Sequence, residues 1–231
     1  MLPDVGVIIV AAGRGARIGG TPKQFRDLAG VPVLLRALRP FTSHPAVACT
    51  VVALPEADAA APPEWLAPLV GDGLRLVAGG SARGDSVRAA LAALPAHCAT
   101  VLVHDGARPL VSRETIDAVI AVAATGAGAV AAVPLGDTLK DVEDGATPLV
   151  VGRTIPRERL WRAQTPQGFP RALLERALNA AAADAVQGTD DAELVERIGG
   201  RVEIVPDQQA NIKLTTPGDF ALAEALLRTV S

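Results

Sequence analysis

Val7-Ile8-Ile9-Val10-Ala11-Ala12-Gly13-Arg14-Gly15-Ala16-Arg17, followed closely by Thr21-Pro22-Lys23-Gln24-Phe25, is the stretch that decides the fold of this chain. It opens with an apolar run short enough for one buried strand, and the run ends in a small loop that contains glycine. Such a loop brings backbone N–H groups close to a bound anion. Two cations, Arg17 and Lys23, can neutralise several negative charges there, which indicates a polyphosphate ligand.

Two common nucleotide-binding motifs do not fit this loop. A dinucleotide-binding fingerprint needs G-x-G-x-x-G, but Ile18 stands where the third glycine belongs. A P-loop needs a lysine directly after its second glycine, but Lys23 comes too late after Gly20. The remaining pattern, A-A-G-x-G-x-R followed by P-K, resembles that of nucleotidyltransferases that join sugar or polyol phosphates to a nucleoside triphosphate. The alternative is that this stretch binds no phosphate and is only a strand followed by a tight turn with cations on the surface.

Composition limits the classes of protein that this chain can belong to. Its 231 residues are 49% hydrophobic, and we expect one domain over residues 1–231. The net charge of −3 gives no excess of positive charge of the kind that binds nucleic acid. Cys49 and Cys98 are lone thiols, which is typical of a reduced, cytoplasmic protein. The uncharged stretch 118–135 is rich in alanine and interrupted by glycines, so we expect a helix, a turn and a strand rather than a membrane span.

Apolar runs alternate with helix-like segments along the chain. The runs are continuously apolar, which is typical of strands buried on both faces and therefore of a mostly parallel sheet. Strands and helices that alternate in this way predict a doubly wound, Rossmann-like α/β fold. The expected strands lie near residues 5–10, 48–54, 74–77, 100–104, 129–133 and 202–205, and the expected helices near 32–42, 86–94, 112–124, 170–183, 191–198 and 217–229.

The segment from about 134 to 160 breaks this pattern. Glycines and prolines divide it into short β-like pieces, at Gly136, Gly145, Pro148, Gly152 and Pro156. The segment is too polar for a core element and too long for an ordinary loop. We expect either a projecting β-arm that pairs with another subunit or a mobile lid.

The apolar run 100–103 leads into His104 and then Asp105-Gly106-Ala107-Arg108-Pro109. In open α/β sheets ligands bind at the carboxyl ends of the strands, so Asp105 and Arg108 should lie beside the first loop. Asp105 can orient a ribose hydroxyl or a metal-bound water, and Arg108 can fork onto a phosphate. An Asp–Arg pair that closes a turn is the alternative. His104 could act as a base, but we favour a hydrogen-bonded structural role.

Several shorter motifs are ambiguous when taken alone. In the stretch 79–86, which lies between a strand and a helix, the glycines allow close backbone approach and Ser86 could cap the helix or touch a base. The stretches 165–169, 189–191 and 211–213 each fit a loop, a helix cap or a strand end.

Taken in order, these motifs resemble the 2-C-methyl-D-erythritol 4-phosphate cytidylyltransferase family of the non-mevalonate isoprenoid pathway. The matching segments keep the order and intervals of the family and span nearly the whole chain, at residues 11–17, 22–24, 79–86, 104–109, 137–140, 164–169, 189–191 and 211–213. The resemblance implies a homodimeric α/β enzyme that uses CTP, a polyol phosphate and Mg²⁺.

The resemblance also implies roles for individual residues. Arg17 and Lys23 would stabilise the transition state at the α-phosphate, Lys213 would position the substrate phosphate, and Arg157 with Thr138 would reach in from the arm of the partner subunit. The expected catalytic residues are Arg17, Lys23, Arg157 and Lys213. The expected substrate-binding residues are Ala11, Ala12, Gly13, Gly15, Gly80, Ser86, Asp105, Arg108, Thr138, Thr165 and Thr189, and no side chain is assigned to a metal.

In the implied reaction, the phosphate oxygen of the polyol phosphate attacks the α-phosphorus of CTP in line, and pyrophosphate leaves. A phosphomonoester carries about −1.5 to −2 charges near neutral pH, so the nucleophile is already an anion and needs no general base. Three alternatives stay open: a ribitol-5-phosphate cytidylyltransferase, a sugar-1-phosphate nucleotidyltransferase that uses UTP or GTP, and a non-catalytic nucleotide-binding regulator.

Overall fold

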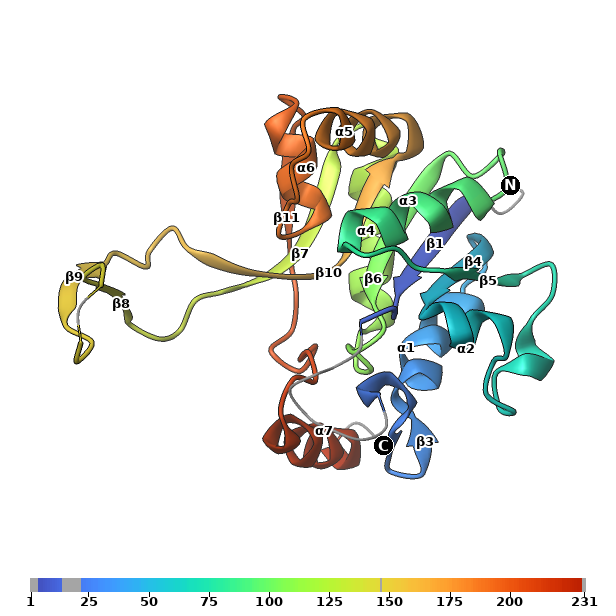
Figure 1. The fold of residues 1–231 in the computed structure, drawn as a ribbon, viewed down its shortest axis with the longest axis horizontal. Helices are drawn as coiled ribbons and strands as arrows, with labels where there is room; N and C mark the ends of the chain where they lie inside the picture. The colour runs from blue at the N-terminus through green and yellow to red at the C-terminus, as the bar shows by residue number, and fades with distance from the viewer. Residues whose placement is uncertain (1–3, 14–21, 146, 230–231) are drawn as a thin grey trace.

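The computed structural model describes residues 4–13, 22–145 and 147–229. Within these ranges the main element is a seven-stranded sheet with helices on both faces (Figure 1). All pairs of neighbouring strands are parallel except the two that involve β10. The strands, in sheet order, are β11 (Val202–Pro206), β7 (Gly128–Pro134), β10 (Trp161–Pro170), β6 (Thr100–Asp105), β1 (Val5–Val10), β4 (Val47–Leu54) and β5 (Leu74–Ala78). The predicted doubly wound, mostly parallel α/β fold is confirmed.

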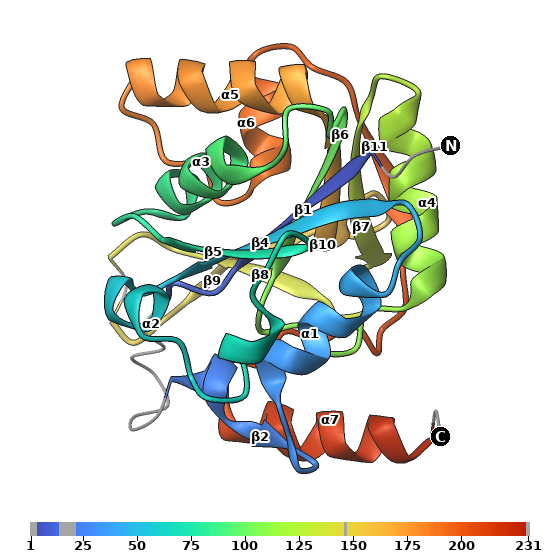
Figure 2. The same cartoon turned by 90° about the vertical axis from the view of Figure 1, so that its right-hand side faces the viewer.

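Helices cover both faces of the sheet because its strands are apolar on both sides. In β1, Ile8 packs into one core cluster while Val7 and Ile9 pack into the other. Figure 2 shows α3, α5 and α6 on one side of the sheet and α1 and α4 on the other. The helices are α1 (Val33–Thr42), α2 (Glu56–Ala60), α3 (Arg83–Ala93), α4 (Arg113–Ala124), α5 (Arg171–Ala183), α6 (Asp191–Arg197) and α7 (Pro217–Thr229).

Each strand and each long helix expected from the sequence is present, within a few residues of its expected bounds. The uncharged stretch 118–135 forms the end of α4, a turn and β7, as expected. Within the described residues, no helix combines the length and the hydrophobicity that crossing a membrane requires. The short helix α2 was not expected.

Strand β10 is the main element that sequence analysis missed. It lies between β6 and β7 and runs antiparallel to both, although its sequence is interrupted by Pro166 and Gly168. A Cβ on Gly168 would come 2.6 Å from Val119 Cγ1, so glycine at this position lets α4 pack closely on the strand. Its polar residues Gln164, Thr165 and Gln167 are buried rather than exposed, which is why they gave no strand pattern.

The segment from 134 to 160 forms a projecting arm, residue 146 being outside the described part. Strands β8 (Leu139–Val142) and β9 (Val151–Ile155) pair antiparallel in a small sheet of their own. Figure 1 shows this hairpin extending far from the seven-stranded sheet. A projecting β-arm is therefore present, and its pairing with another subunit stays a prediction.

A third cluster positions the C-terminal part of the chain. The short strands β2 (Asp27–Leu28) and β3 (Val31–Pro32) form a hairpin. Leu28 and Val33 pack there against Phe220 of α7 and Leu214. Two 3₁₀ turns complete the described elements, η1 (Lys23–Phe25) and η2 (Ala67–Leu69). The packing of α7 places the loop that precedes it, with Lys213, beside the carboxyl ends of the central strands.

Candidate active site

A cleft of about 260 Å³ lies at the carboxyl ends of β1 and β6, where open α/β sheets bind their ligands. Its walls come from the loop after β1, the start of η1, the loop before α3, the turn after β6, and Lys213. Eight of the residues expected from the sequence line it together: Ala11, Ala12, Gly13, Lys23, Gly80, Ser86, Asp105 and Lys213.

Gln24 holds the loop that follows β1. Its buried side chain donates a hydrogen bond through Nε2 to the Ala11 carbonyl at 2.9 Å, and the Gly13 carbonyl lies 3.4 Å from the same nitrogen. Lys23 is the preceding residue, and its side chain lines the cleft. The position of Lys23 is therefore tied to the same backbone that is expected to approach the phosphates.

The loop before α3 packs directly against the loop after β1. A Cβ on Gly79 would come 2.3 Å from Ala12 Cβ and 2.8 Å from Ser86 Oγ, so only glycine permits this approach. The Ser86 hydroxyl accepts a hydrogen bond from the Gly80 N–H at 3.1 Å and donates one to the Ala82 carbonyl at 3.2 Å. Ser86 therefore shapes the loop as well as lining the cleft.

Asp105 lies at the centre of a cluster of cations. Its Oδ2 is 2.7 Å from Lys213 Nζ, and the guanidinium groups of Arg83 and Arg108 each lie 3.7 Å from the carboxylate. Burial raises the pKa of Asp105, but the charges of Lys213, Arg83 and Arg108 together outweigh burial and lower it to about 2. Asp105 is therefore an anion at neutral pH.

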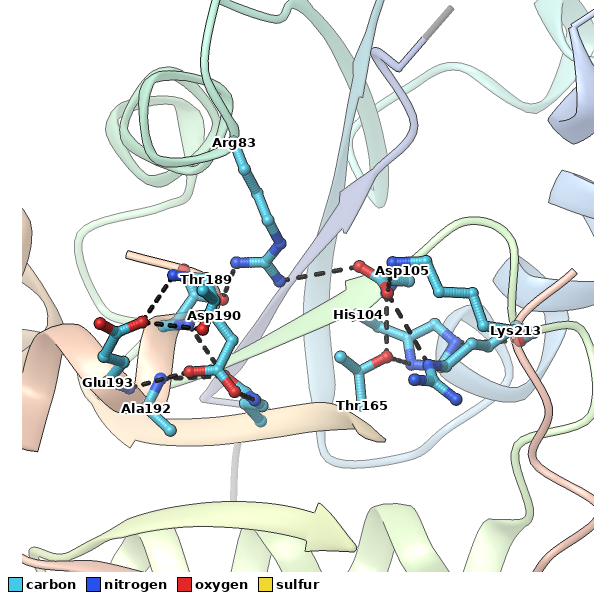
Figure 3. Close-up of polar contacts among 12 residues, drawn as sticks. Arg83, His104, Asp105, Thr165, Thr189, Asp190, Ala192, Glu193 and Lys213 are labelled. Atoms are coloured by element: carbon cyan, nitrogen blue, oxygen red, sulfur yellow. Dashed lines mark hydrogen bonds and ion pairs between the residues drawn. The ribbon is translucent and has the colours of Figure 1, made fainter. Parts of the chain in front are cut away.

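Arg83 connects the cleft to the start of α6, as Figure 3 shows. Its Nη1 lies 2.5 Å from Asp191 Oδ2, while its Nη2 faces Asp105. Gln167 of β10 holds this end of α6, because its Oε1 accepts hydrogen bonds from the backbone N–H groups of Asp191 and Ala192 at 3.1 and 3.0 Å. Burial lowers the pKa of Arg83, but the carboxylates of Asp191 and Asp105 raise it by more, so Arg83 stays charged at the edge of the cleft.

His104 is a buried structural residue, as the sequence analysis favoured. Its Nε2 donates to the Arg108 carbonyl at 3.0 Å, and its Nδ1 lies 2.9 Å from the Thr165 hydroxyl. Burial lowers its pKa to about 4, so the ring is neutral at neutral pH. His104 is not among the described residues that line the cleft, and this location gives no support to a role as the base.

Three of the expected substrate-binding residues lie in the body of the protein but outside the lining of the cleft. Arg108 is buried behind Asp105, and its Nη1 donates to the Asn211 carbonyl at 2.8 Å. Thr165 is also buried, and its hydroxyl accepts a hydrogen bond from the backbone N–H of Asp105 at 3.0 Å. The Thr189 hydroxyl donates to the Glu193 carboxylate at 2.8 Å, just before α6.

The other expected residues lie elsewhere. Thr138 and Arg157 are on the projecting arm, where Arg157 donates a hydrogen bond to the Gly136 carbonyl. The arm does not bring them to the cleft of the same chain. Arg17 and Gly15 lie outside the described residues.

Sequence analysis gave no role to three residues that build this site. Gln24, Arg83 and Asp191 each fall inside a segment that matches the family, and that was the one available signal. Their partners are distant in sequence: Arg83 and Asp191 are 108 positions apart. Such pairs become visible only when the fold brings the segments together.

The cleft is suited to binding phosphates. Its described lining residues include three cations, Lys23, Arg83 and Lys213, and a single carboxylate, Asp105. No nucleophile–histidine pair occurs among these lining residues. In the described part of the chain, no group of three or more His, Cys, Asp or Glu residues could hold a metal ion. Preorganised cations of this kind can bind a polyphosphate and stabilise negative charge that develops on a phosphoryl group.

The doubly wound sheet, its close-packed loops and the cationic cleft define an enzyme of the nucleotidyltransferase class. A family model described as 2-C-methyl-D-erythritol 4-phosphate cytidylyltransferase matches residues 5–229. The chain belongs to this family.

Individual relatives agree with this assignment. A protein of Salinibacter ruber named 2-C-methyl-D-erythritol 4-phosphate cytidylyltransferase is 44% identical over 227 residues, covering 96% of this chain and 92% of the relative. A protein of the same name from Symbiobacterium thermophilum is 47% identical over 225 residues, with the same coverage. The crystal structure of the enzyme of that name from Thermus thermophilus superposes with a TM-score of 0.81 at 38% identity, covering 97% of this chain and 99% of the other.

Proposed function

We propose that the chain transfers the cytidylyl group of CTP to 2-C-methyl-D-erythritol 4-phosphate and releases pyrophosphate, as a step of the non-mevalonate isoprenoid pathway. The observation that carries the proposal is the cleft itself, whose described lining holds three cations, Lys23, Arg83 and Lys213, and one ionised carboxylate, Asp105, in a chain of this family. The substrates are thus CTP and a polyol phosphate, and net charge gives no support for nucleic acid as a partner.

The attacking group is the phosphate oxygen of the polyol phosphate, which attacks the α-phosphorus in line. Because this oxygen is already an anion, the residues of the cleft need not remove a proton from it. They must reduce the repulsion between two anions and stabilise the charge of the transition state. Lys23 and, outside the described residues, Arg17 would act at the α-phosphate, while Lys213 would position the phosphate of the second substrate.

We also propose Mg²⁺ as the cofactor. Mg²⁺ is usually bound through one or two carboxylates together with substrate phosphates and water. Asp105 is the one carboxylate among the described lining residues; its Oδ2 pairs with Lys213, so its Oδ1 would serve as the single protein ligand. When bound, the ion would neutralise phosphate charge.

The arm supports a further part of the proposal, a homodimer in which each arm completes the site of the partner subunit. A two-stranded hairpin is at best marginally stable alone. Among the described residues, this one leaves five large apolar side chains substantially exposed: Leu139, Val142, Leu149, Val150 and Val151. A second copy that covers them would allow Arg157 and Thr138 to approach its cleft. The two buried thiols agree with a cytoplasmic location, which stays a prediction.

The proposal is tested by pyrophosphate release with Mg²⁺, methylerythritol 4-phosphate and each of CTP, UTP, GTP and ATP in turn. We expect rapid release with CTP alone, together with a product whose mass equals CMP plus the polyol phosphate less one water. A preference for UTP or GTP would indicate a sugar nucleotidyltransferase. Tight binding of CTP by the folded protein without turnover would indicate a regulator.

A further inference from the structure

Thr165 is connected to both members of the Asp105–Lys213 ion pair. Its hydroxyl accepts a hydrogen bond from the backbone N–H of Asp105 at 3.0 Å. Its carbonyl accepts one at 2.8 Å from Nδ2 of Asn211, two residues before Lys213. One buried residue of β10 therefore holds the end of β6 and the loop that carries Lys213.

The Thr165 side chain replaces part of the sheet ladder. Backbone pairing between β6 and β10 reaches Gln167 opposite Val103, and an irregularity in β10 lies between Ala163 and Gln167. Beyond this point the Asp105 N–H pairs with a hydroxyl rather than with a backbone carbonyl. A buried N–H without a partner is costly, so removal of this hydroxyl should disturb the backbone beneath Asp105.

His104 determines the direction in which this hydroxyl donates. The Arg108 carbonyl can only accept a hydrogen bond, so Nε2 of His104 must carry the hydrogen. In the neutral ring Nδ1 is then an acceptor, and the Thr165 hydroxyl donates to it at 2.9 Å. The oxygen of that hydroxyl is left to accept from the Asp105 N–H.

On the basis of the cytidylyl transfer proposed above, we propose that Thr165 is a positioning residue that sets the Asp105–Lys213 ion pair, with His104 fixing the direction of its hydroxyl. The resemblance assigned Thr165 to the substrate instead. In this structure both of its polar groups already have protein partners.

Two pairs of matched variants distinguish a positioning role of Thr165 from a direct contact with the substrate. Thr165→Val keeps the shape and removes the hydroxyl, whereas Thr165→Ser keeps the hydroxyl. In His104→Gln the side-chain amide lies near the position of Nε2 in the wild type, so Thr165 loses its acceptor. In His104→Asn the side-chain amide lies near the position of Nδ1, so an acceptor for Thr165 is kept. We expect kcat to fall by about tenfold or more in Thr165→Val and His104→Gln, on the scale of one unpaired buried group, and to change by less than about threefold in Thr165→Ser. His104→Asn should fall between these results.

The double variant Thr165→Val/His104→Gln gives a readout that a direct substrate contact would not produce. Both changes break the same hydrogen bond, so the loss in the double variant should be close to that of one single variant. A substrate contact predicts a raised KM for the polyol phosphate in Thr165→Val, no change of KM in His104→Gln, and additive losses. That result, or equal losses in Thr165→Ser and Thr165→Val, would overturn the proposal.

Hydrogen exchange at the Asp105 amide tests the same geometry without turnover. In the ligand-free protein, exchange at this amide should accelerate about tenfold or more in Thr165→Val and His104→Gln relative to the amide of Leu102 in the same strand. An unchanged Asp105 amide would overturn the proposal even in an active enzyme. If the unmodified protein did not turn over CTP, the exchange result would still decide the positioning role, so failure of the proposed function would remain distinguishable.

Discussion

Asp105 and His104 are adjacent and both buried, yet burial leaves one charged and the other neutral. Three cations surround Asp105 and overcome the unfavourable effect of burial on its charge. His104 faces a carbonyl and a hydroxyl, which accommodate the neutral ring, and burial lowers its pKa. The sequence indicates which titratable residues stand at the end of this strand, but not the charge that each carries. Charge depends on neighbours such as Arg83 and Lys213 that only the fold brings near.

Lys23 tests the cationic cleft at the level of one side chain. We expect Lys23→Ala to lower kcat by roughly a hundredfold or more, because it removes one preorganised group that stabilises transition-state charge. Steady-state kinetics with both substrates would measure the effect. Arg201→Ala makes the same change in net charge at an exposed residue paired with Glu203, and it should leave kcat nearly unchanged. Near-normal turnover of a folded Lys23→Ala variant would remove Lys23 from the mechanism.

The depressed pKa of His104 predicts a pH-dependent stability. The unfolded chain takes up a proton at this residue below about pH 6.5, whereas the folded protein resists protonation down to about pH 4. The stabilising contribution is therefore complete above pH 6.5 and is lost as the pH falls toward 4, by up to about 3 kcal/mol.

Thermal unfolding of the wild type and of His104→Gln between pH 7 and 4 measures this contribution. Tm of the wild type should fall more steeply with acidification than Tm of the variant. Asp105 does not interfere in this range, since its lowered pKa makes its contribution fade only below about pH 4. Parallel curves for the two proteins would show that His104 is not held neutral by the fold.

The pattern of apolar residues predicted most strands and helices of the fold. It did so because strands such as β1 and β4 are buried on both faces and are therefore continuously apolar. It failed for β10, whose Gln164, Thr165 and Gln167 are buried and each form hydrogen bonds to other segments. A polar residue in a sequence is ordinarily assigned to the surface. Buried polar residues with distant partners break that rule, and here they support the active site.

The loop before α3 provides a prediction at this scale. Gly79→Ala would place a methyl group against Ala12 and Ser86. We expect the loop after β1 and the loop before α3 to move apart, because overpacking of this kind displaces backbone. The affinity for CTP should then fall by about tenfold. Gly84→Ala is the matched control. Nothing lies within 4 Å of a Cβ at Gly84, and it is in the first turn of α3.

Calorimetric titration with CTP, together with Tm, compares these two glycine variants. Gly84→Ala should bind CTP like the wild type and should not lose stability, because alanine favours the helix. Equal affinities for the two variants would contradict the role given to the close contact between the loops.

At the scale of the whole molecule, the arm is the feature that one chain cannot explain. Its position was predictable from its glycines, prolines and polarity, whereas the surface that would cover it in the proposed homodimer was not, because that surface would belong to a second copy. Arg157 and Thr138 lie on this arm, away from the cleft of their own chain.

Complementation between inactive subunits tests the arm. Arg157→Ala should raise KM for the polyol phosphate and, if Arg157 acts in the partner subunit, dimers that combine it with Lys23→Ala should contain one intact site. Co-expression with two affinity tags isolates such mixed dimers. We expect partial recovery of activity above that of either variant alone. No recovery in verified mixed dimers would show that each chain uses its own Arg157, or none.

The proposed function requires that the chain join CTP to methylerythritol 4-phosphate rather than to another polyol phosphate. The most direct measurement is kcat/KM for pyrophosphate release from CTP, with methylerythritol 4-phosphate and ribitol 5-phosphate compared under identical conditions with Mg²⁺. We predict that methylerythritol 4-phosphate is strongly preferred and that ribitol 5-phosphate is scarcely used. Preference for ribitol 5-phosphate would preserve the fold and the chemistry but contradict the proposed substrate, and no release with either would contradict the proposed function.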